Sequence, residues 1–337
     1  MDIPEYKIPE YEIPYYEDNT RISNSAIGWF LNKGPAYLRR MLDGKEKGLD
    51  LPQLRKGTMI HEFLLQPEQF WDDYMLFVGE KPKSAQAQKF CENLINTVEI
   101  ELNKQLSEAY RKSYSIVGKS EDKILSEALK ISVEYKDYIE ALKSKKILIS
   151  QYDLDQLVAI GHNVGAHKLA CQLLRKAGEH GFTHIYHEFQ INWDFHCFKC
   201  IKCKSLLDSC AFDFQNKVCT IMDIKTTAKL WHFEDSMKEF DYCRQLCFYK
   251  NAVYWYLANV LGITNELDKW RFEFYIIAID TTGSNEIRVF RLDSSQVCSR
   301  NGVINDTMIE IAWHMDKNLW EHGYEYYAGD GSETLDL

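Results

Sequence analysis

The chain has 337 residues, of which 45% are hydrophobic, so it is long enough to bury one large core. Its net charge of −10 argues against a protein that coats nucleic acid with a basic surface, although basic residues could still line a groove. Ten cysteines in so long a chain do not indicate a disulfide scaffold, and neither a membrane-spanning run nor a signal peptide is expected, which predicts a cytoplasmic protein of a bacterium or a phage-infected cell.

The N-terminal segment repeats an Ile-Pro pattern (IPEY, IPEY, IPYY), which is typical of an extended arm over residues 1–20. A disordered tail is an equally good interpretation of the same pattern. Ser23 is placed to cap a short helix over 26–33, and Gly34-Pro35 separates that helix from a second one over 36–44.

Helical spacing continues through the N-terminal half. It predicts a helix over 54–65 and long amphipathic helices over 84–112, 120–145 and 153–177. Strand signals are sparse in this part of the chain, so we expect a helical flank over about 84–177.

The pattern changes at residue 183, where short stretches alternate between apolar and polar residues. We expect four consecutive strands as an antiparallel meander, with turns at 194–196 and 215–217. Later elements are predicted as a helix over 240–262, strands over 270–280 and 286–292, and a closing helix over 305–323. The predicted fold class is α/β, with a mixed central sheet and a largely helical N-terminal half.

Acidic residues occupy three of the predicted strands: Glu188, Asp208 and Asp223. Lys225 follows Asp223 at i+2, so both side chains leave the same face of the strand. Carboxylates are ligands that Mg²⁺ accepts, and a bound ion can activate water against a phosphodiester. The pattern therefore indicates metal-dependent hydrolysis, with the lysine orienting water and stabilising developing charge.

The arrangement resembles the PD-(D/E)xK nuclease superfamily, in which an acid, a turn and a strand precede Asp-x-Lys. Residues 223–227 (DIKTT) are similar to the DxKTT form of this motif. Residues 57–61 (GTMIH) and 245–249 (QLCFY) are similar to the GxxxH and QxxxY helix motifs of its RecB-like and RecE-like branches. With further blocks in the same order over about 22–256, the chain resembles the RecE-like (exodeoxyribonuclease VIII-like) exonucleases of phages and bacteria.

This resemblance implies a restriction-endonuclease-like core: a single nuclease domain over 21–325, with its catalytic part at about 183–260 and a tail over 326–337. The implied metal ligands are His61, Asp208, Asp223 and Ile224, the last through its main chain. The implied catalytic residues are Asp208, Asp223, Lys225, Glu188, Gln245 and Tyr249, where Gln245 and Tyr249 hold the lysine or a phosphate. The implied cofactor is Mg²⁺, and the imidazole makes Mn²⁺ an expected substitute.

Basic residues near the GTMIH helix are candidates for phosphate contacts, with a solvated basic face as the alternative. The candidate nucleic-acid-binding residues are Arg39, Arg40, Arg55, Lys56, Lys204 and Thr226. Lys204 stands four residues before Asp208, but Leu206 and Leu207 occupy positions where the family often has another basic residue.

The resemblance further implies 5′-to-3′ hydrolysis of linear double-stranded DNA from its ends, for recombination or end resection. It also implies a single-strand annealing protein as partner and a ring-shaped homo-oligomer. Two alternatives are a nuclease-fold DNA- or partner-binding protein without turnover, and an iron–sulfur single-strand nuclease that uses Cys197, Cys200 and Cys203. Against the cluster, residues three apart on a strand face opposite sides, so Cys200 and Cys203 are expected to diverge.

Overall fold

The computed structural model describes residues 9–46, 48, 51–99, 101–175, 178–180 and 183–333. The chain separates into two compact units, a larger one within 1–65 and 160–337 and a smaller one at 66–159. The smaller unit overlaps the predicted helical flank at 84–177 and lies within the predicted single domain over 21–325. The domain boundaries themselves stay a prediction. Residues 1–8 of the predicted arm and 334–337 of the predicted tail lie outside the described residues.

The smaller unit consists mainly of helices, with two short parallel strands. Its elements are α3 (Phe70–Asp73), β1 (Tyr74–Leu76), α4 (Ala85–Asn96), α5 (Leu102–Ser113), α6 (Glu121–Glu134), α7 (Lys136–Lys143), β2 (Ile147–Ile149) and the first part of α8 (Gln151–Ala166). The helix expected over 84–112 is wrong as a single element. The chain leaves α4 at Thr97, and the Gln105 side chain donates to the carbonyls of Leu94 and Thr97 at the end of α4. This turn lets Phe90 and Tyr110 pack into one core.

The helices of the larger unit mostly follow the predicted pattern. They are α1 (Asn24–Leu42), α2 (Pro52–Leu65), α9 (Lys168–Leu173), α10 (Phe233–Glu239), α11 (Tyr242–Asn259), α12 (Ser294–Cys298), α13 (Asn301–Lys317) and α14 (Tyr324–Ala328), with short 3₁₀ turns η1 (Leu230–His232) and η2 (Leu267–Lys269). Ser23 caps α1 by accepting from the Ala26 amide, and the predicted break appears as a kink at Gly34, whose φ is 78°. No described helix has the length and apolar character needed to span a membrane.

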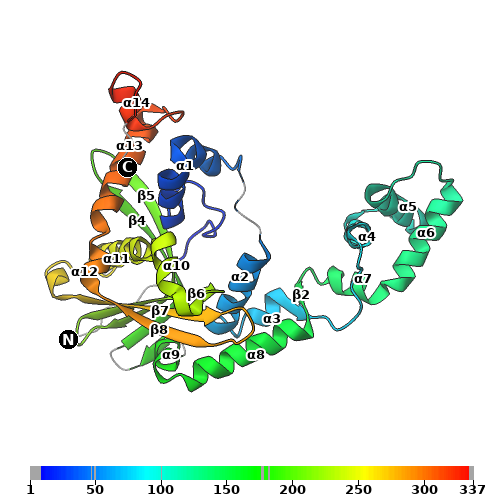
Figure 1. Cartoon of the computed structure of the whole chain (residues 1–337), viewed down its shortest axis with the longest axis horizontal. Coiled ribbons are helices and arrows are strands. Elements are labelled where there is room, and N and C mark those ends of the chain that lie inside the picture. Colours follow the sequence, from blue (N-terminus) through cyan, green and yellow to red (C-terminus); the bar gives the residue numbers. More distant parts are fainter. Residues whose placement is uncertain are drawn as a thin grey trace. The chain divides into compact units, whose positions relative to one another are not determined.

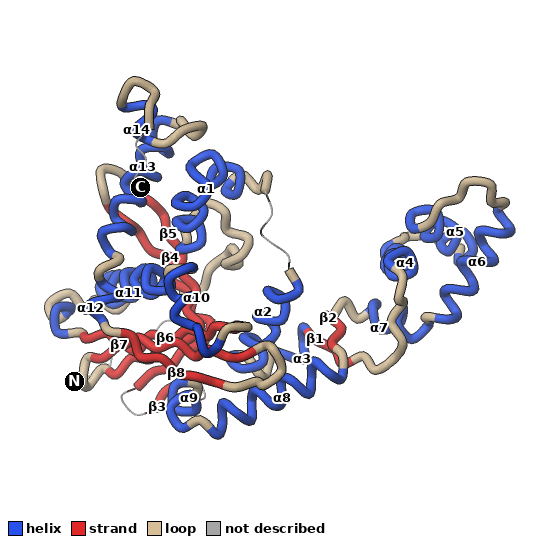
Figure 2. Tube along the Cα trace, viewed as in Figure 1, coloured by secondary structure: helices blue, strands red, loops and turns tan. Residues whose placement is uncertain are grey.

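A mixed sheet forms the centre of the larger unit and confirms the predicted α/β fold class (Figures 1 and 2). Its order is β3-β4-β5-β6-β7-β8, with β3 at Gly178–His180, β4 at Thr183–His196, β5 at Cys200–Asp213, β6 at Val218–Thr227, β7 at Arg271–Asp280 and β8 at Ile287–Leu292. Neighbours are antiparallel except β6 and β7, which α11 connects as a parallel pair.

The four-strand meander is wrong in detail. The two predicted strands over 198–215 form the single strand β5, and residues 194–196 continue β4 instead of turning. The chain reverses at residues 197–199, because His196 already pairs with Cys200. The turn predicted at 215–217 is confirmed between β5 and β6.

Strands β5 and β6 diverge, and this divergence positions the candidate site. They pair from Asp213 and Val218 as far as Ser209 and Met222, after which β5 stays with β4 and β6 stays with β7. Helix α2 contacts both β5 and β6, and α11 packs on β4, β5 and β6 (Figure 1). Buried aromatic side chains hold α11 to the sheet: Phe189, Phe212, Phe248 and Tyr256.

Candidate active site

Helix α2 brings His61 to the sheet because Gly57 lets it approach closely. A Cβ atom on Gly57 would lie 3.1 Å from Oγ1 of Thr226 on β6, so a larger side chain would push the two elements apart. One helical turn later, Nδ1 of His61 lies 3.4 Å from Oδ2 of Asp208 on β5. The glycine and histidine of the GTMIH motif thus have separate structural tasks, close packing and contact with the acid.

Glu188 stands at an irregularity in the β4–β5 ladder. Its φ of 49° is in the left-handed region, and the ladder pairs His187 with Ser209 and Phe189 with Leu207 on either side of it. A non-glycine residue in this conformation costs about 1–3 kcal/mol and is a recurrent feature of functional sites. The Glu188 carboxylate thereby comes together with His61 and Asp208, whose ligand atoms all lie within 4.8 Å of one another.

Asp208 binds β6 where the ladder between β5 and β6 has ended. Its Oδ2 accepts a 2.7 Å hydrogen bond from the Ile224 amide, and its side chain is 13% exposed. The carboxylate therefore replaces a main-chain acceptor and fixes the distance between the diverging strands. The Ile224 main chain lies at the site, as the resemblance implies, and its proposed role as a metal ligand stays a prediction.

Asp223 is buried and is held from two sides. One oxygen forms an ion pair with Lys225, and the other accepts a 3.1 Å hydrogen bond from Nε2 of Gln245. The same Gln245 nitrogen donates to the Tyr249 hydroxyl at 2.8 Å, so the two residues share one face of α11, as expected. Nζ of Lys225 also lies 4.9 Å from the ring centre of Tyr242.

The electrostatics of this group favour a bound cation. Burial and the nearby carboxylates raise the pKa of Glu188 to about 8, and burial raises the pKa of Asp223 to about 6 despite Lys225. Burial also raises the pKa of Asp208. Burial would lower the pKa of Lys225, but Asp223 and Asp208 raise it, so the ammonium stays charged. Burial and Lys225 lower the pKa of His61 to about 4, which leaves its imidazole neutral and able to bind a metal.

Two further residues belong to the site, and sequence reasoning did not single them out. Oε2 of Glu62 is buried without a hydrogen-bond partner, and its carboxylate helps to raise the pKa of Glu188. Tyr242 covers the Lys225 ammonium from α11. The signal for Tyr242 was its position on the same face of α11 as Gln245. Glu62 directly follows the GTMIH motif, which ends at His61, so the motif did not include it.

The candidate phosphate-binding residues are more dispersed. On α2, Lys56 donates to the Thr281 carbonyl at 3.2 Å, and Thr226 lies against Gly57. On α1, Arg39 pairs with Asp43, and Arg40 pairs with Glu46 at 3.0 Å. Arg55 precedes Lys56 on α2. Phosphate binding by these residues stays a prediction.

Lys204 has a different placement from the one expected for a phosphate contact. It is buried, and its Nζ donates to the carbonyls of Tyr15 at 2.6 Å and Asp18 at 2.5 Å. Ile22 then forms a parallel β-bridge to Cys203, in the part of β5 that does not pair with β6. Lys204 therefore anchors the described part of the arm to the sheet.

In the alternative with an iron–sulfur cluster, Cys197, Cys200 and Cys203 would be ligands, but the described structure does not gather their three sulfur atoms into one group. Cys203 is buried and Cys200 is exposed, which confirms the expected divergence of the two side chains on β5.

A crystal structure of a "Putative exonuclease" from Eubacterium rectale is similar in fold to this chain. The TM-score is 0.50 at 11% sequence identity, and the match covers 98% of this chain and 96% of the other. At this identity the likeness shows the fold alone. No family model matches the sequence, and no curated protein matches it either.

The fold places a helix, two diverging strands and a second helix around one point, and the residues at that point determine the chemistry. Those residues are carboxylates, a neutral imidazole and a charged lysine in a largely buried setting.

Proposed function

We propose that this chain is a Mg²⁺-dependent deoxyribonuclease and, more narrowly, an exonuclease. The observation that carries the proposal is the convergence of His61, Glu188 and Asp208 beside the Asp223–Lys225 ion pair. Helix α2 and the three consecutive strands β4, β5 and β6 supply these groups. Structural packing alone does not require acidic residues to gather in a buried place.

The residues fit a divalent cation. The group holds the carboxylates of Glu62, Glu188, Asp208 and Asp223 near the ammonium of Lys225. Burial, and then repulsion by the other carboxylates, raises the pKa of Glu188, and a cation would relieve that repulsion. His61, Asp208, Asp223 and the Ile224 carbonyl would hold Mg²⁺, with Mn²⁺ as a substitute. When bound, the ion would supply Lewis-acid polarisation of the scissile phosphate and a lowered pKa for attacking water.

The remaining groups would position the attacking water and the Asp223 and Lys225 side chains, and would stabilise charge on the phosphate. Lys225 is charged and held by Asp223, so its ammonium can orient water and stabilise negative charge that develops on the phosphate. Gln245 fixes the opposite oxygen of Asp223 and is itself fixed by Tyr249. Tyr242 limits the directions in which the Lys225 chain can move.

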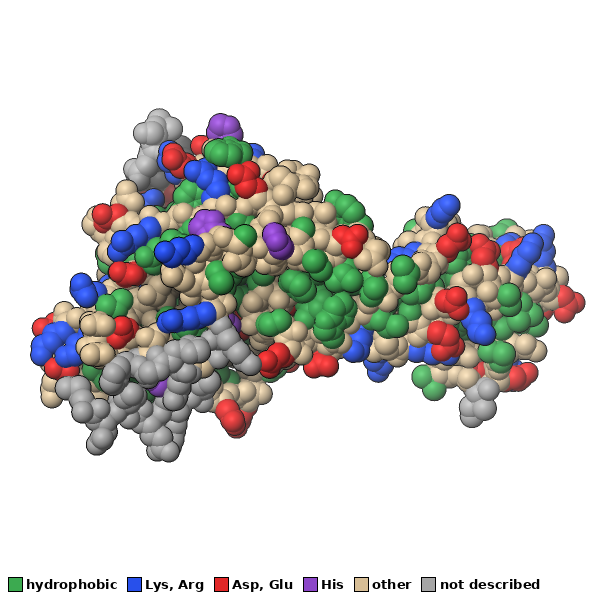
Figure 3. Space-filling model, turned by 90° about the horizontal axis from the view of Figure 1, so that it is seen from below, with side chains coloured by type: hydrophobic (Ala, Val, Ile, Leu, Met, Phe, Trp, Pro, Cys, Tyr) green, Lys and Arg blue, Asp and Glu red, His purple; other side chains and the backbone are tan. Residues whose placement is uncertain are grey.

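The fold shared with the "Putative exonuclease" from Eubacterium rectale supports a nuclease-like function only. The RecE-like motifs support attack on duplex ends in the 5′-to-3′ direction. The same resemblance supports linear double-stranded DNA as substrate, a single-strand annealing partner and a ring of identical chains. On the face shown in Figure 3, basic and acidic side chains are interspersed over α4–α7 (at the right). That face of the helical unit offers no continuous basic strip. We place DNA binding near the site on the larger unit, where Lys56 of α2 and Thr226 of β6 lie.

The decisive experiment compares 5′-labelled linear duplex with closed circular plasmid, in Mg²⁺ or in EDTA. We expect Mg²⁺-dependent loss of the linear DNA while the circle persists, and no activity for Asp223→Asn. Glu273→Gln is the matched control, because Glu273 lies on the neighbouring strand and pairs with Arg291 on β8. Cleavage of the circle would make the enzyme an endonuclease. No cleavage of either DNA or of single strands would contradict the nuclease proposal and favour a DNA- or partner-binding protein.

A further inference from the structure

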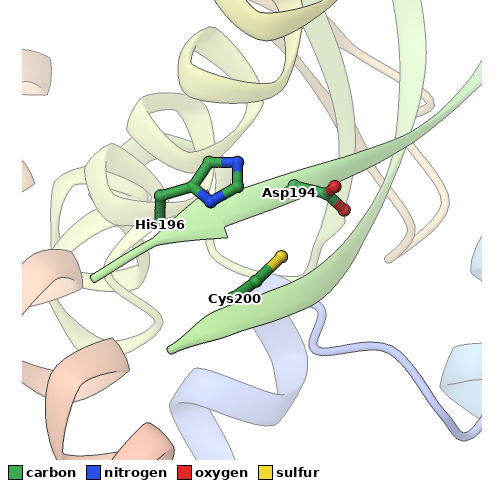
Figure 4. A group of neighbouring side chains, drawn as sticks. All are labelled: Asp194, His196 and Cys200. Atoms are coloured by element: carbon green, nitrogen blue, oxygen red, sulfur yellow. The ribbon is translucent and has the colours of Figure 1, made fainter. Parts of the chain in front are cut away.

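The far end of the β4–β5 hairpin carries a second group of metal-binding side chains. Asp194 and His196 are two residues apart on β4, so they leave the same face of the strand. His196 pairs directly with Cys200 on β5, which brings the sulfur to that face as well. Figure 4 shows the three side chains leaving the two strands on the same side, with the Cys200 sulfur turned toward the space between the other two.

The three ligand atoms lie close enough to bind one ion. A carboxylate oxygen of Asp194, a ring nitrogen of His196 and Sγ of Cys200 are all within 4.8 Å of one another. Rotation about the side-chain bonds of the exposed His196 and Cys200 can bring them to metal–ligand distances of about 2.0–2.3 Å.

The chemistry of the ligands indicates the class of ion. Thiolate, imidazole and carboxylate together suit zinc and similar borderline ions, whereas Mg²⁺ prefers oxygen alone. Three protein ligands on an exposed hairpin leave the remaining coordination position to water or to an external ligand. Cys197 is turned away from this role, because its sulfur donates to the Lys199 carbonyl within the turn at 3.1 Å.

We propose that Asp194, His196 and Cys200 form a binding site for a zinc-class ion that fastens the end of the β4–β5 hairpin. The site is independent of the proposed nuclease activity, because its ligands point to a different ion and none of them contacts the Asp208–Asp223 group. One competitor is present: Nζ of Lys202 lies 3.0 Å from both oxygens of Asp194. The Lys202 side chain is 56% exposed, so it can move away when an ion binds.

Cobalt substitution tests the site directly. Protein stripped with chelator and kept reduced is titrated with Co²⁺, and the thiolate-to-cobalt charge-transfer absorption is recorded. We expect a band that saturates at one ion per chain and disappears when Zn²⁺ is added. A Co²⁺ ion at the Asp208–Asp223 group would give no such band, because that group contains no sulfur ligand.

Variants identify the ligands. Cys200→Ser should abolish the band, and His196→Ala should weaken Co²⁺ binding by more than the roughly 10–100-fold that loss of an outer-shell partner causes. Cys171→Ser is the matched control, since Cys171 is an exposed free cysteine on α9, and it should keep the band. A band that is absent from the wild type, or that persists in Cys200→Ser, would overturn the proposal.

Lys202→Met gives a second readout that does not depend on losing a ligand. Removing the competing ammonium should tighten Co²⁺ binding several-fold without changing the band. Unchanged or weaker binding would contradict the geometry, because Lys202 contacts the Asp194 oxygens that the ion needs.

Discussion

The middle and the end of the β4–β5 hairpin each gather side chains of the types that can bind metals, but in opposite surroundings. Around Asp208 and Asp223, the side chains are largely buried and are held by Gln245 and the Ile224 amide. At the hairpin end, His196 and Cys200 are exposed, and Asp194 pairs with the exposed side chain of Lys202. At the hairpin end, the pairing of β4 with β5 is enough to bring candidate ligands together. Around Asp208 and Asp223, helices and a further strand pack on the side chains, which fixes their positions and changes their pKa values.

The largest expected effect is the loss of DNA cleavage in Asp223→Asn, which should leave metal binding at the hairpin end unchanged. Asp223→Asn should lower DNA cleavage by about 1000-fold or more, because it removes both the charge on the metal side and the partner of Lys225. The same variant should keep the Co²⁺ thiolate band, and Cys200→Ser should keep cleavage. Rates measured by single-turnover digestion of linear duplex, beside Co²⁺ titrations, check both statements. A common loss of both properties would show that the two regions act as one.

The supporting residues around Asp223 should have the next largest effect. Tyr249→Phe removes the hydroxyl that accepts from Gln245, and Gln245→Ala removes the donor to Asp223. We expect cleavage to fall by roughly 10–100-fold in Gln245→Ala and by less in Tyr249→Phe. Isothermal titration with Mn²⁺ would show whether the loss lies in metal affinity. A wild-type rate in Gln245→Ala would contradict the positioning role.

The close approach of α2 should matter for activity more than for stability. Gly57→Ala gains up to about 1 kcal/mol in helix propensity, but its Cβ would meet Oγ1 of Thr226 at 3.1 Å. We expect a small change in the free energy of unfolding and about a 10-fold loss of cleavage, as small displacements in a positioned site are costly. The double variant with Thr226→Ser keeps the hydroxyl contact and should keep the loss of cleavage, whereas Thr226→Ala should restore most of the rate. A wild-type rate in Gly57→Ala would contradict the role of this close approach.

A smaller effect should appear in the pH dependence of stability. Glu188 has a folded-state pKa of about 8 against an ordinary value of 4.5, so the folded metal-free protein binds its proton more tightly than the unfolded chain does. This contribution is complete below pH 4.5 and is lost as the pH rises to about 8. Thermal unfolding should therefore show a steeper fall in Tm from pH 5 to pH 8 in the wild type than in Glu188→Gln. Excess Mg²⁺ should remove the difference at pH 8, and an equal slope in both proteins would refute the assignment.

Much of the candidate site followed from the sequence because its residues lie in short motifs with fixed spacing. Asp223 and Lys225 share a strand face, and Gln245 and Tyr249 share a helix face, so local periodicity was enough. The helix boundaries of the smaller unit were harder to predict. Apolar spacing continues through residue 97, and nothing local shows that Gln105 will close the turn between α4 and α5.

The ends of the strands could not be predicted from local sequence either. The Asp194-Phe-His stretch has turn-like composition, yet it extends β4 because the partner strand supplies Cys200 and Lys202 opposite it. The anchoring of Lys204 by main-chain carbonyls depends on an arm nearly two hundred residues earlier in the chain. Such pairings between distant segments leave no periodic signal in either segment.

The distance along the chain between α2 and α11 has a consequence for synthesis. His61 is translated early, the helical unit follows, and the Gln245 face of α11 emerges only after three long strands. Contacts of such high sequence separation form late, since the entropy of closing the intervening loop must be overcome first. A nascent or truncated chain therefore lacks the groups that hold Asp223, and we expect cleavage of DNA ends to begin only once the larger unit has been completed and folded.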